Sequence, residues 1–197
     1  MSFRVVRGRV AAEILTAATD ADLLTMGKVS WAHTRHAKLG STALAVATSA
    51  PNAVLLARPG TPSNHQVVVL YDGSVNAKQA VSIAMRFVKA ESSLLVITMA
   101  ETASANKRQH LVQILGMQAS YQRLESTDIL SLINAVKKEG CELLVLSSHN
   151  RLLEENTIKR FLNEVDCSLL LIRQQIGLRL LISECRFILQ SGGNFSQ

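Results

Sequence analysis

The sequence predicts an α/β fold with an open, mostly parallel sheet, arranged as one and a half copies of a strand-and-helix unit. Three observations support this prediction. Short runs rich in β-branched residues alternate with amphipathic helical stretches. Hydrophobic residues make up 48% of the 197 residues and aromatic residues only 4%. Leu, Val, Ile and Ala therefore form the core, as in parallel sheets packed between helices. Part of the alternation also occurs twice along the chain.

The longer copy, residues 66–174, contains five predicted strands: Val67–Tyr71, Leu94–Met99, Ala119–Leu124, Glu142–Leu146 and Ser168–Ile172. Four predicted helices alternate with them: Asn76–Lys89, Lys107–Gly116, a helix capped by Ser126 or Thr127 that runs to Lys138, and Glu154–Glu164. The apolar residues of the first and third helices recur at intervals of three and four, which is typical of a helix with one buried face. This order implies parallel strands joined by right-handed crossovers.

The first sixty residues repeat the second half of that pattern. The predicted elements are a strand at Phe3–Val6, a helix at Val10–Thr19, a strand at Asp22–Met26, a helix at Ser41–Ala50 and a strand at Ala53–Ala57. Ala21–Leu24 aligns with Cys141–Leu144 at an offset of 120 residues, and Ala53–Arg58 aligns with Ser168–Arg173 at an offset of 115. The shorter copy therefore begins at its third strand.

These matches divide the chain into four parts. Residues 1–60 are a partial unit, and residues 61–65 are a linker with prolines and a glycine around it. Residues 66–174 are the longer unit, and residues 175–197 are a tail. The tail is apolar at first, ambiguous between strand and helix, and its Gly- and Ser-containing end is predicted to be disordered.

Composition and charge narrow the classes of function. The net charge is +6, of which residues 1–60 contribute seven Lys or Arg against three Asp or Glu. A basic first segment attracts phosphate, but the lack of a long basic run and the few aromatic residues argue against nucleic acid. No apolar run is long enough for a membrane span. The cysteines and histidines lack metal-ligand spacing, and Cys141 and Cys167 are interpreted as core residues rather than redox groups. We expect a cytoplasmic protein.

One loop has the composition of a phosphate-binding site. It runs from Gly27-Lys28-Val29-Ser30 across nine residues to Gly40-Ser41-Thr42, between a predicted strand and a predicted helix. Glycines allow backbone N–H groups to approach an anion, and the start of the helix adds unpaired donors and a favourable dipole. Four basic residues in this loop could neutralise phosphate: Lys28, Arg35, His36 and Lys38.

This loop, together with the turn Asp72-Gly73-Ser74 after the strand at Val67–Tyr71, resembles the universal stress protein family. The resemblance covers residues 1–60 and 66–174. It implies an open-sheet, adenine nucleotide α-hydrolase-like or Rossmann-like sandwich. It also implies that the protein has a regulatory role and is not an enzyme. It also implies binding of ATP or AMP with Mg²⁺ at eight residues: Gly27, Lys28, Ser30, Gly40, Ser41, Thr42, Asp72 and Ser74.

The chain also departs from the family pattern. Ser30 stands where the family has a second glycine, the second copy reads Ser147-Ser148-His149-Asn150 at the equivalent place, and the aspartate occurs only in the second copy as Asp72. Three interpretations therefore remain open. The loop is a structural remnant and the chain a dimerisation module, the loop binds nucleotide, or the chain is a weak ATPase.

Two further alternatives concern individual parts of the chain. Asp72 and Ser74 either cap the following helix or bind ligand. Because a partial unit exposes a sheet edge, residues 1–60 should pack against the second copy, pair with another subunit, or be a fragment of a longer protein. The final strands, Ala53–Ala57 and Ser168–Ile172, are the candidates for that pairing, and we expect a homodimer or a higher oligomer.

Overall fold

The computed structural model describes residues 5–29, 39–59, 66–88, 92–99, 119–125, 128–147, 160 and 162–173. The predicted linker, the helix predicted at 107–116, most of the helix predicted at 154–164 and the tail lie outside these ranges. Within the described ranges, no helix is long and apolar enough to cross a membrane.

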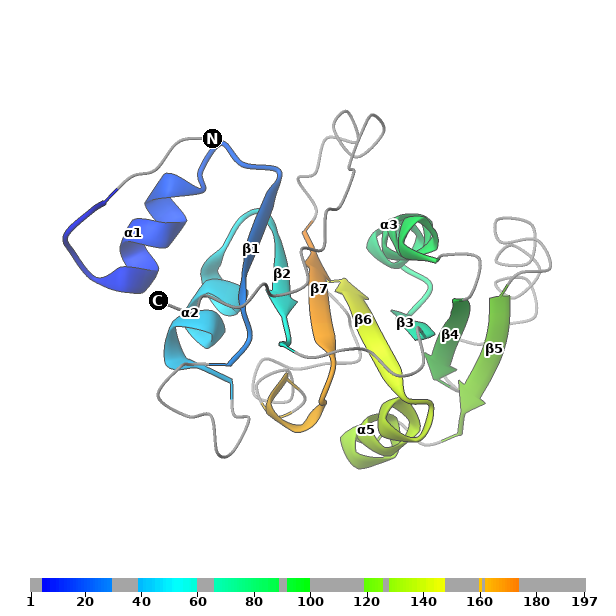
Figure 1. Ribbon diagram of the computed structural model, residues 1–197. Coiled ribbons are helices and arrows are strands. Elements are labelled where there is room, and N and C mark those ends of the chain that lie inside the picture. Colours follow the sequence, from blue (N-terminus) through cyan, green and yellow to red (C-terminus); the bar gives the residue numbers. More distant parts are fainter. Residues whose placement is uncertain are drawn as a thin grey trace, which may run out of the picture.

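Seven strands form one sheet in the order β1-β2-β7-β6-β3-β4-β5 (Figure 1). Their bounds are β1 Leu23–Gly27, β2 Ala53–Ala57, β3 Gln66–Tyr71, β4 Ser93–Met99, β5 Ala119–Leu124, β6 Cys141–Ser147 and β7 Ser168–Ile172. Neighbouring strands are parallel except β2 and β7, which are antiparallel. The predicted α/β class is confirmed, and these strands begin and end within one residue of their predicted bounds.

The described helices are α1 Val10–Ala17, α2 Ser41–Ser49, α3 Val75–Ala84 and α5 Ile129–Lys138. The helix predicted at 76–89 ends early, and a 3-10 turn at Met85–Phe87 follows it. The N-cap of α5 is Asp128, while Ser126 and Thr127 lie outside the described residues. Gly140 follows the C-cap of α5, Glu139, and has a φ of 63°, a left-handed conformation that glycine adopts without strain.

The strand predicted at Phe3–Val6 is wrong where the structure describes it. Val5 and Val6 lie in no strand, and they are 78% and 44% exposed. β-Branched residues favour a strand only where they pack against a neighbouring strand and are buried on one face of a sheet. The pattern of apolar residues was therefore a weaker predictor here than in the buried strands.

The core lies on both faces of the sheet. On one face, apolar residues of α2 and α5 pack against alternate residues of the strands, including Leu56, Leu144 and Leu169. On the other face, α3 packs against the residues between them, including Val69 and Val145. Figure 1 shows α3 and α5 on opposite sides of the strands. We call these the α5 face and the α3 face.

The strand pairs β1–β2 and β6–β7 have the same register. Leu23 pairs with Ala53, and Leu143 pairs with Ser168, which are the equivalents at the offsets of 120 and 115. The equivalence continues to the ends of the strands, where Gly27 pairs with Ala57 and Ser147 with Ile172. Both pairs therefore lie at matching places in parallel arrangements, as the sequence alignment predicts.

The contact between β2 and β7 is symmetric about its centre. Leu55 pairs with Leu170, and on either side Val54 pairs with Leu171 and Leu56 with Leu169. Since Leu55 and Leu170 are equivalent positions, the contact is a local twofold. Residues 1–60 therefore pack against residues 66–174 through β2 and β7, which was one of the alternatives left open.

Two arginines strengthen this contact. Arg58 follows β2 and its guanidinium donates a hydrogen bond to the Asp166 carbonyl, while its backbone N–H donates to Ser168 Oγ over 3.1 Å. Arg173 follows β7, and its guanidinium donates to the Ala47 carbonyl near the C-terminal end of α2. The last carbonyls of a helix have no partner within the helix, so such donors satisfy backbone groups that would otherwise need water.

Candidate functional site

The antiparallel contact between β2 and β7 separates the predicted site residues into two groups. Gly27 ends β1, which runs parallel to β2, whereas Asp72 follows β3, which runs parallel to β6 and β7. The carboxyl ends of β1 and β3 therefore lie at opposite ends of the sheet. The glycine loop and the Asp72 turn are two separate places in this chain.

The first group surrounds the carboxyl end of β1. Gly27 is exposed, and a Cβ at this position would lie 3.8 Å from the Val29 carbonyl oxygen, an ordinary contact distance. The protein itself therefore leaves room for a side chain there. A glycine that the fold does not require suits a place where a ligand approaches the backbone closely.

The described ends of the glycine loop are held together by backbone pairing. Val29 and Leu39 form an isolated antiparallel bridge, and the Gly40 N–H donates to the Lys28 carbonyl over 3.1 Å. The start of α2 is thereby brought to the end of β1. The middle of the loop, which includes Ser30, Arg35, His36 and Lys38, lies outside the described residues.

The N-terminus of α2 has no side-chain cap. Its N-cap is Gly40, which has an extended backbone and no side chain to accept a hydrogen bond. The Gly40 carbonyl accepts from the Leu44 N–H over 2.9 Å, the first bond within the helix. The N–H groups before Leu44 have no partner within an α-helix, and Ser41 is exposed while Thr42 is half-buried. This arrangement of donors can bind an anion.

The side chain of Lys28 is directed away from solvent and is bound to backbone carbonyls of another segment. Its side chain is buried at 2% exposure, and its Nζ donates to the Val165 carbonyl and, over 3.1 Å, to the Cys167 carbonyl. Burial lowers the pKa of this ammonium from its usual value, because the charged form loses water. This placement favours a role in joining the end of β1 to the start of β7 over the expected role of neutralising phosphate.

The second group, at the other end of the sheet, caps α3. Asp72 Oδ1 accepts from the Ser74 N–H over 2.9 Å, and Ser74 Oγ accepts from the Ala77 N–H over 3.1 Å. Gly73 has a φ of 81°, so glycine is needed in this turn. The structure therefore has the capping arrangement that the sequence left as one of two alternatives. Asp72 is buried and raises the pKa of Tyr71, although burial of that phenol is the larger cause.

Two groups near the first site were not singled out for function by the sequence. Arg58 lies next to Ala57, whose carbonyl accepts from the Lys28 N–H over 2.8 Å, and Cys141 and Cys167 lie close to Lys28. The alignment of Arg58 with Arg173 was the available signal for the arginine. Among the described residues, no group of three or more His, Cys, Asp and Glu could hold a metal ion.

Comparison with solved structures identifies the fold. A universal stress protein from Archaeoglobus fulgidus DSM 4304 superposes with a TM-score of 0.65 at 16% identity, covering 83% of this chain and 66% of that one. A functionally unknown protein from Pseudomonas aeruginosa PAO1 superposes with a TM-score of 0.61 at 15% identity, covering 85% of this chain and 69% of that one. No sequence-family model and no curated protein matches the chain.

The chain thus has the fold of universal stress proteins, and the resemblance stated from the sequence is confirmed at the level of fold. The chain spans 66% of the Archaeoglobus protein, slightly under two thirds of its length.

Proposed function

We propose that this chain, which has the universal stress protein fold, is a non-catalytic regulatory protein that binds an adenine nucleotide by its phosphates at the N-terminus of α2. One observation carries the proposal: the helix begins at Gly40 without a side-chain cap and is held against the carboxyl end of β1 beside Gly27. Backbone N–H groups and the helix dipole are the usual phosphate ligands at such a place.

We expect contacts with the phosphates to supply most of the free energy of nucleotide binding. Asp72, one of the nucleotide-binding residues that the resemblance implies, follows β3 at the other end of the sheet, and its Oδ1 accepts a hydrogen bond from the Ser74 N–H. The ammonium of Lys28 is buried. We therefore expect ATP to bind more tightly than AMP, with little discrimination among bases and with any Mg²⁺ held mainly by the phosphates.

A titration of ATP, ADP and AMP with and without Mg²⁺ tests the proposal, with Trp31 fluorescence and the melting temperature as readouts. A ligand with a Kd of about 10 µM raises the free energy of unfolding by about 2.7 kcal/mol at a hundredfold excess of ligand over Kd. No change at millimolar ATP would instead favour a remnant loop. Phosphate release should not exceed that of a protein-free control, and release above it would favour the ATPase alternative.

Two variants test whether the nucleotide binds beside Gly27. Gly27→Val places a side chain where the ligand should approach, in a position where a Cβ makes only an ordinary contact, so the fold should persist while nucleotide binding is lost. Asp72→Asn is the matched control at the opposite end of the sheet and should bind as the parent does. Equal loss of affinity in both variants would contradict a site at Gly27.

We further propose that residues 1–60 and 66–174 are one and a half copies of one unit, which gives a second candidate function, assembly. The identical registers of β1–β2 and β6–β7 support the repeat. In the second copy β3 pairs with the outer edge of β6, whereas the equivalent edge of β1 ends the described sheet. We expect this edge to pair with a second copy of the chain.

The residues of the two edge strands favour β1 as the interface. β1 reads Leu-Leu-Thr-Met-Gly and contains no charged residue. β5, the other edge strand of the described sheet, contains Gln122 and Arg123. Charged and polar residues protect free edges from pairing. Light scattering should show a dimer that Thr25→Lys converts to monomer, while Ser120→Lys on β5 leaves it unchanged. A parent chain that is monomeric at every concentration would contradict assembly through β1.

A further inference from the structure

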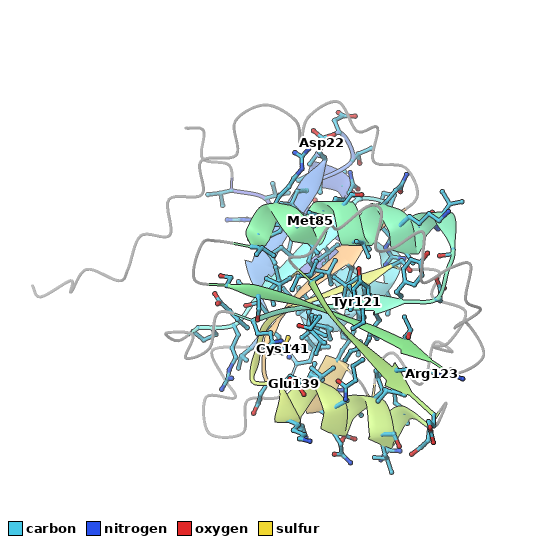
Figure 2. The ribbon with its side chains drawn as sticks, turned by 90° about the vertical axis from the view of Figure 1, so that its right-hand side faces the viewer. Asp22, Met85, Tyr121, Arg123, Glu139 and Cys141 are labelled. Carbon is cyan, nitrogen blue, oxygen red and sulfur yellow. The ribbon has the colours of Figure 1, made fainter. Side chains whose placement is uncertain are left out.

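Two cysteines lie together at the starts of neighbouring strands. Cys141 begins β6, and Cys167 directly precedes β7, its parallel neighbour. Both belong to the core on the α5 face, and their side chains share a hydrogen bond. Cys167 is 3% exposed, while Cys141 is only partly buried. Figure 2 labels Cys141 at the start of β6, just above Glu139, on the side of the sheet where α5 lies.

A bulge in β6 brings these thiols to the same face. Gln66 of β3 pairs with Cys141 and the next residue, Val67, pairs with Leu143, so Glu142 is an additional residue in the strand. Side chains two apart in a regular strand point to the same face. Here Cys141 packs on the α5 face and Leu143 on the α3 face. Bulges change the direction of side chains in this way, and without this one Cys141 would lie on the opposite face from Cys167.

The surroundings of the pair favour a thiolate on Cys167. The hydrogen bond from Cys141 lowers the pKa of the Cys167 thiol, burial opposes this effect, and the nearby Lys28 ammonium lowers the pKa further. The same hydrogen bond, together with burial, raises the pKa of Cys141, so Cys141 keeps its proton. Lys28 is held in place by its bonds to the Val165 and Cys167 carbonyls. A neighbouring cation that stabilises the thiolate makes a cysteine more reactive.

We propose that Cys141 and Cys167 are a redox-active pair that forms an intramolecular disulfide with hydrogen peroxide as the oxidant. The Cys167 thiol releases its proton to water, and its thiolate attacks one peroxide oxygen. The O–O bond breaks, and the departing hydroxide takes up the released proton to form water, leaving a sulfenic acid on Cys167. The Cys141 sulfur then attacks the Cys167 sulfur, and its proton leaves with the hydroxyl as water. Two thiols and one peroxide thereby give one disulfide and two waters.

The test uses the full chain with Cys185→Ser, so that only the two proposed cysteines remain. Peroxide should remove both free thiols at the same rate, lower the mass of the monomer by about 2 Da, and give a 141–167 cross-linked peptide that dithiothreitol reverses. With Cys141→Ser in addition, the reaction should stop at a sulfenic acid on Cys167 that dimedone traps. With Cys167→Ser, neither product should form.

Lys28→Met measures the contribution of the ammonium. We expect peroxide to consume the thiols more slowly in this variant, because loss of the ammonium raises the pKa of Cys167 and so reduces the fraction of thiolate. The loss of thiols in urea serves as the reference for unhindered cysteines. The proposal is overturned if the folded chain keeps both thiols while the unfolded chain loses them. It is also overturned if the two thiols react independently to sulfinic acids, or if the products are only cross-linked dimers.

Discussion

The pairing of Leu55 with Leu170 allows a direct measurement of how residues 1–60 and residues 66–174 are joined. These residues face each other across the only antiparallel contact described in the sheet, and both belong to the core on the α3 face at 8% and 2% exposure. Replacing a buried Leu by Ala costs about 2–5 kcal/mol from the lost transfer free energy and the cavity left behind. We expect about 2–3 kcal/mol for Leu55→Ala and somewhat more for Leu170→Ala.

The coupling between the two substitutions is the informative quantity. Side chains in contact show interaction free energies of about 0.5–3 kcal/mol in double-mutant cycles, and directly opposed pairs in sheets lie at the lower end. The double variant should therefore lose at least about 0.5 kcal/mol less than the sum of the single losses. Urea unfolding followed by circular dichroism and by Trp31 fluorescence measures all four proteins.

A second cycle serves as the control for this measurement. Leu132 of α5 is fully buried, but it belongs to the core on the α5 face. Leu132→Ala combined with Leu55→Ala should be additive within about 0.5 kcal/mol. If Leu55 and Leu170 are also additive, or if the two probes report separate unfolding transitions, residues 1–60 and residues 66–174 do not fold as one unit through β2 and β7.

Three further outcomes follow from individual contacts. Ser74→Ala should reduce the free energy of unfolding by about 1 kcal/mol, since Ser74 Oγ caps α3, and Ser74→Thr should restore most of it; an unchanged denaturation midpoint would contradict the cap. Gly73→Ala should cost about 1–2 kcal/mol by the same assay, because φ is 81°, whereas an equal loss for the exposed Ser82→Ala would point to a non-specific effect. The folded state lowers the pKa of Lys28 below 10.5, so the unfolded chain binds more protons between the two values. The difference in stability between the parent and Lys28→Met should therefore shift in favour of the parent as pH rises toward 10.5, and a difference independent of pH would refute the burial of a titrating ammonium.

The fold could be predicted from the sequence to the extent that local pattern and tertiary context agree. Val67–Tyr71 is apolar throughout because both of its faces are buried, so its composition alone identifies an interior strand. The alignment of Ala53–Arg58 with Ser168–Arg173 predicted which strands are equivalent, and their registers match. Val5 and Val6 have the same β-branched character without a neighbouring strand, so the same rule failed there.

The candidate site was predictable only in its parts. The glycines that end β1 and begin α2, and the caps of α3, are local features that each depend on a few consecutive residues. The position of Lys28 directly after Gly27 in the loop predicted that it is a phosphate ligand. In the structure its side chain reaches the Cys167 carbonyl, 139 residues away, and no local pattern encodes such a contact.

By itself, the sequence determined that this protein is an α/β chain, because burial on two faces and helical periodicity leave direct traces in residue order. Only the tertiary structure decided that β2 and β7 run antiparallel, which places Gly27 and Asp72 at opposite ends of the sheet. It also decided that a bulge at Glu142 turns Cys141 toward Cys167. The antiparallel pairing and the bulge both depend on hydrogen bonds between segments that are distant in the sequence. The direction and register of a strand are set by the strands it pairs with, rather than by its own residues alone.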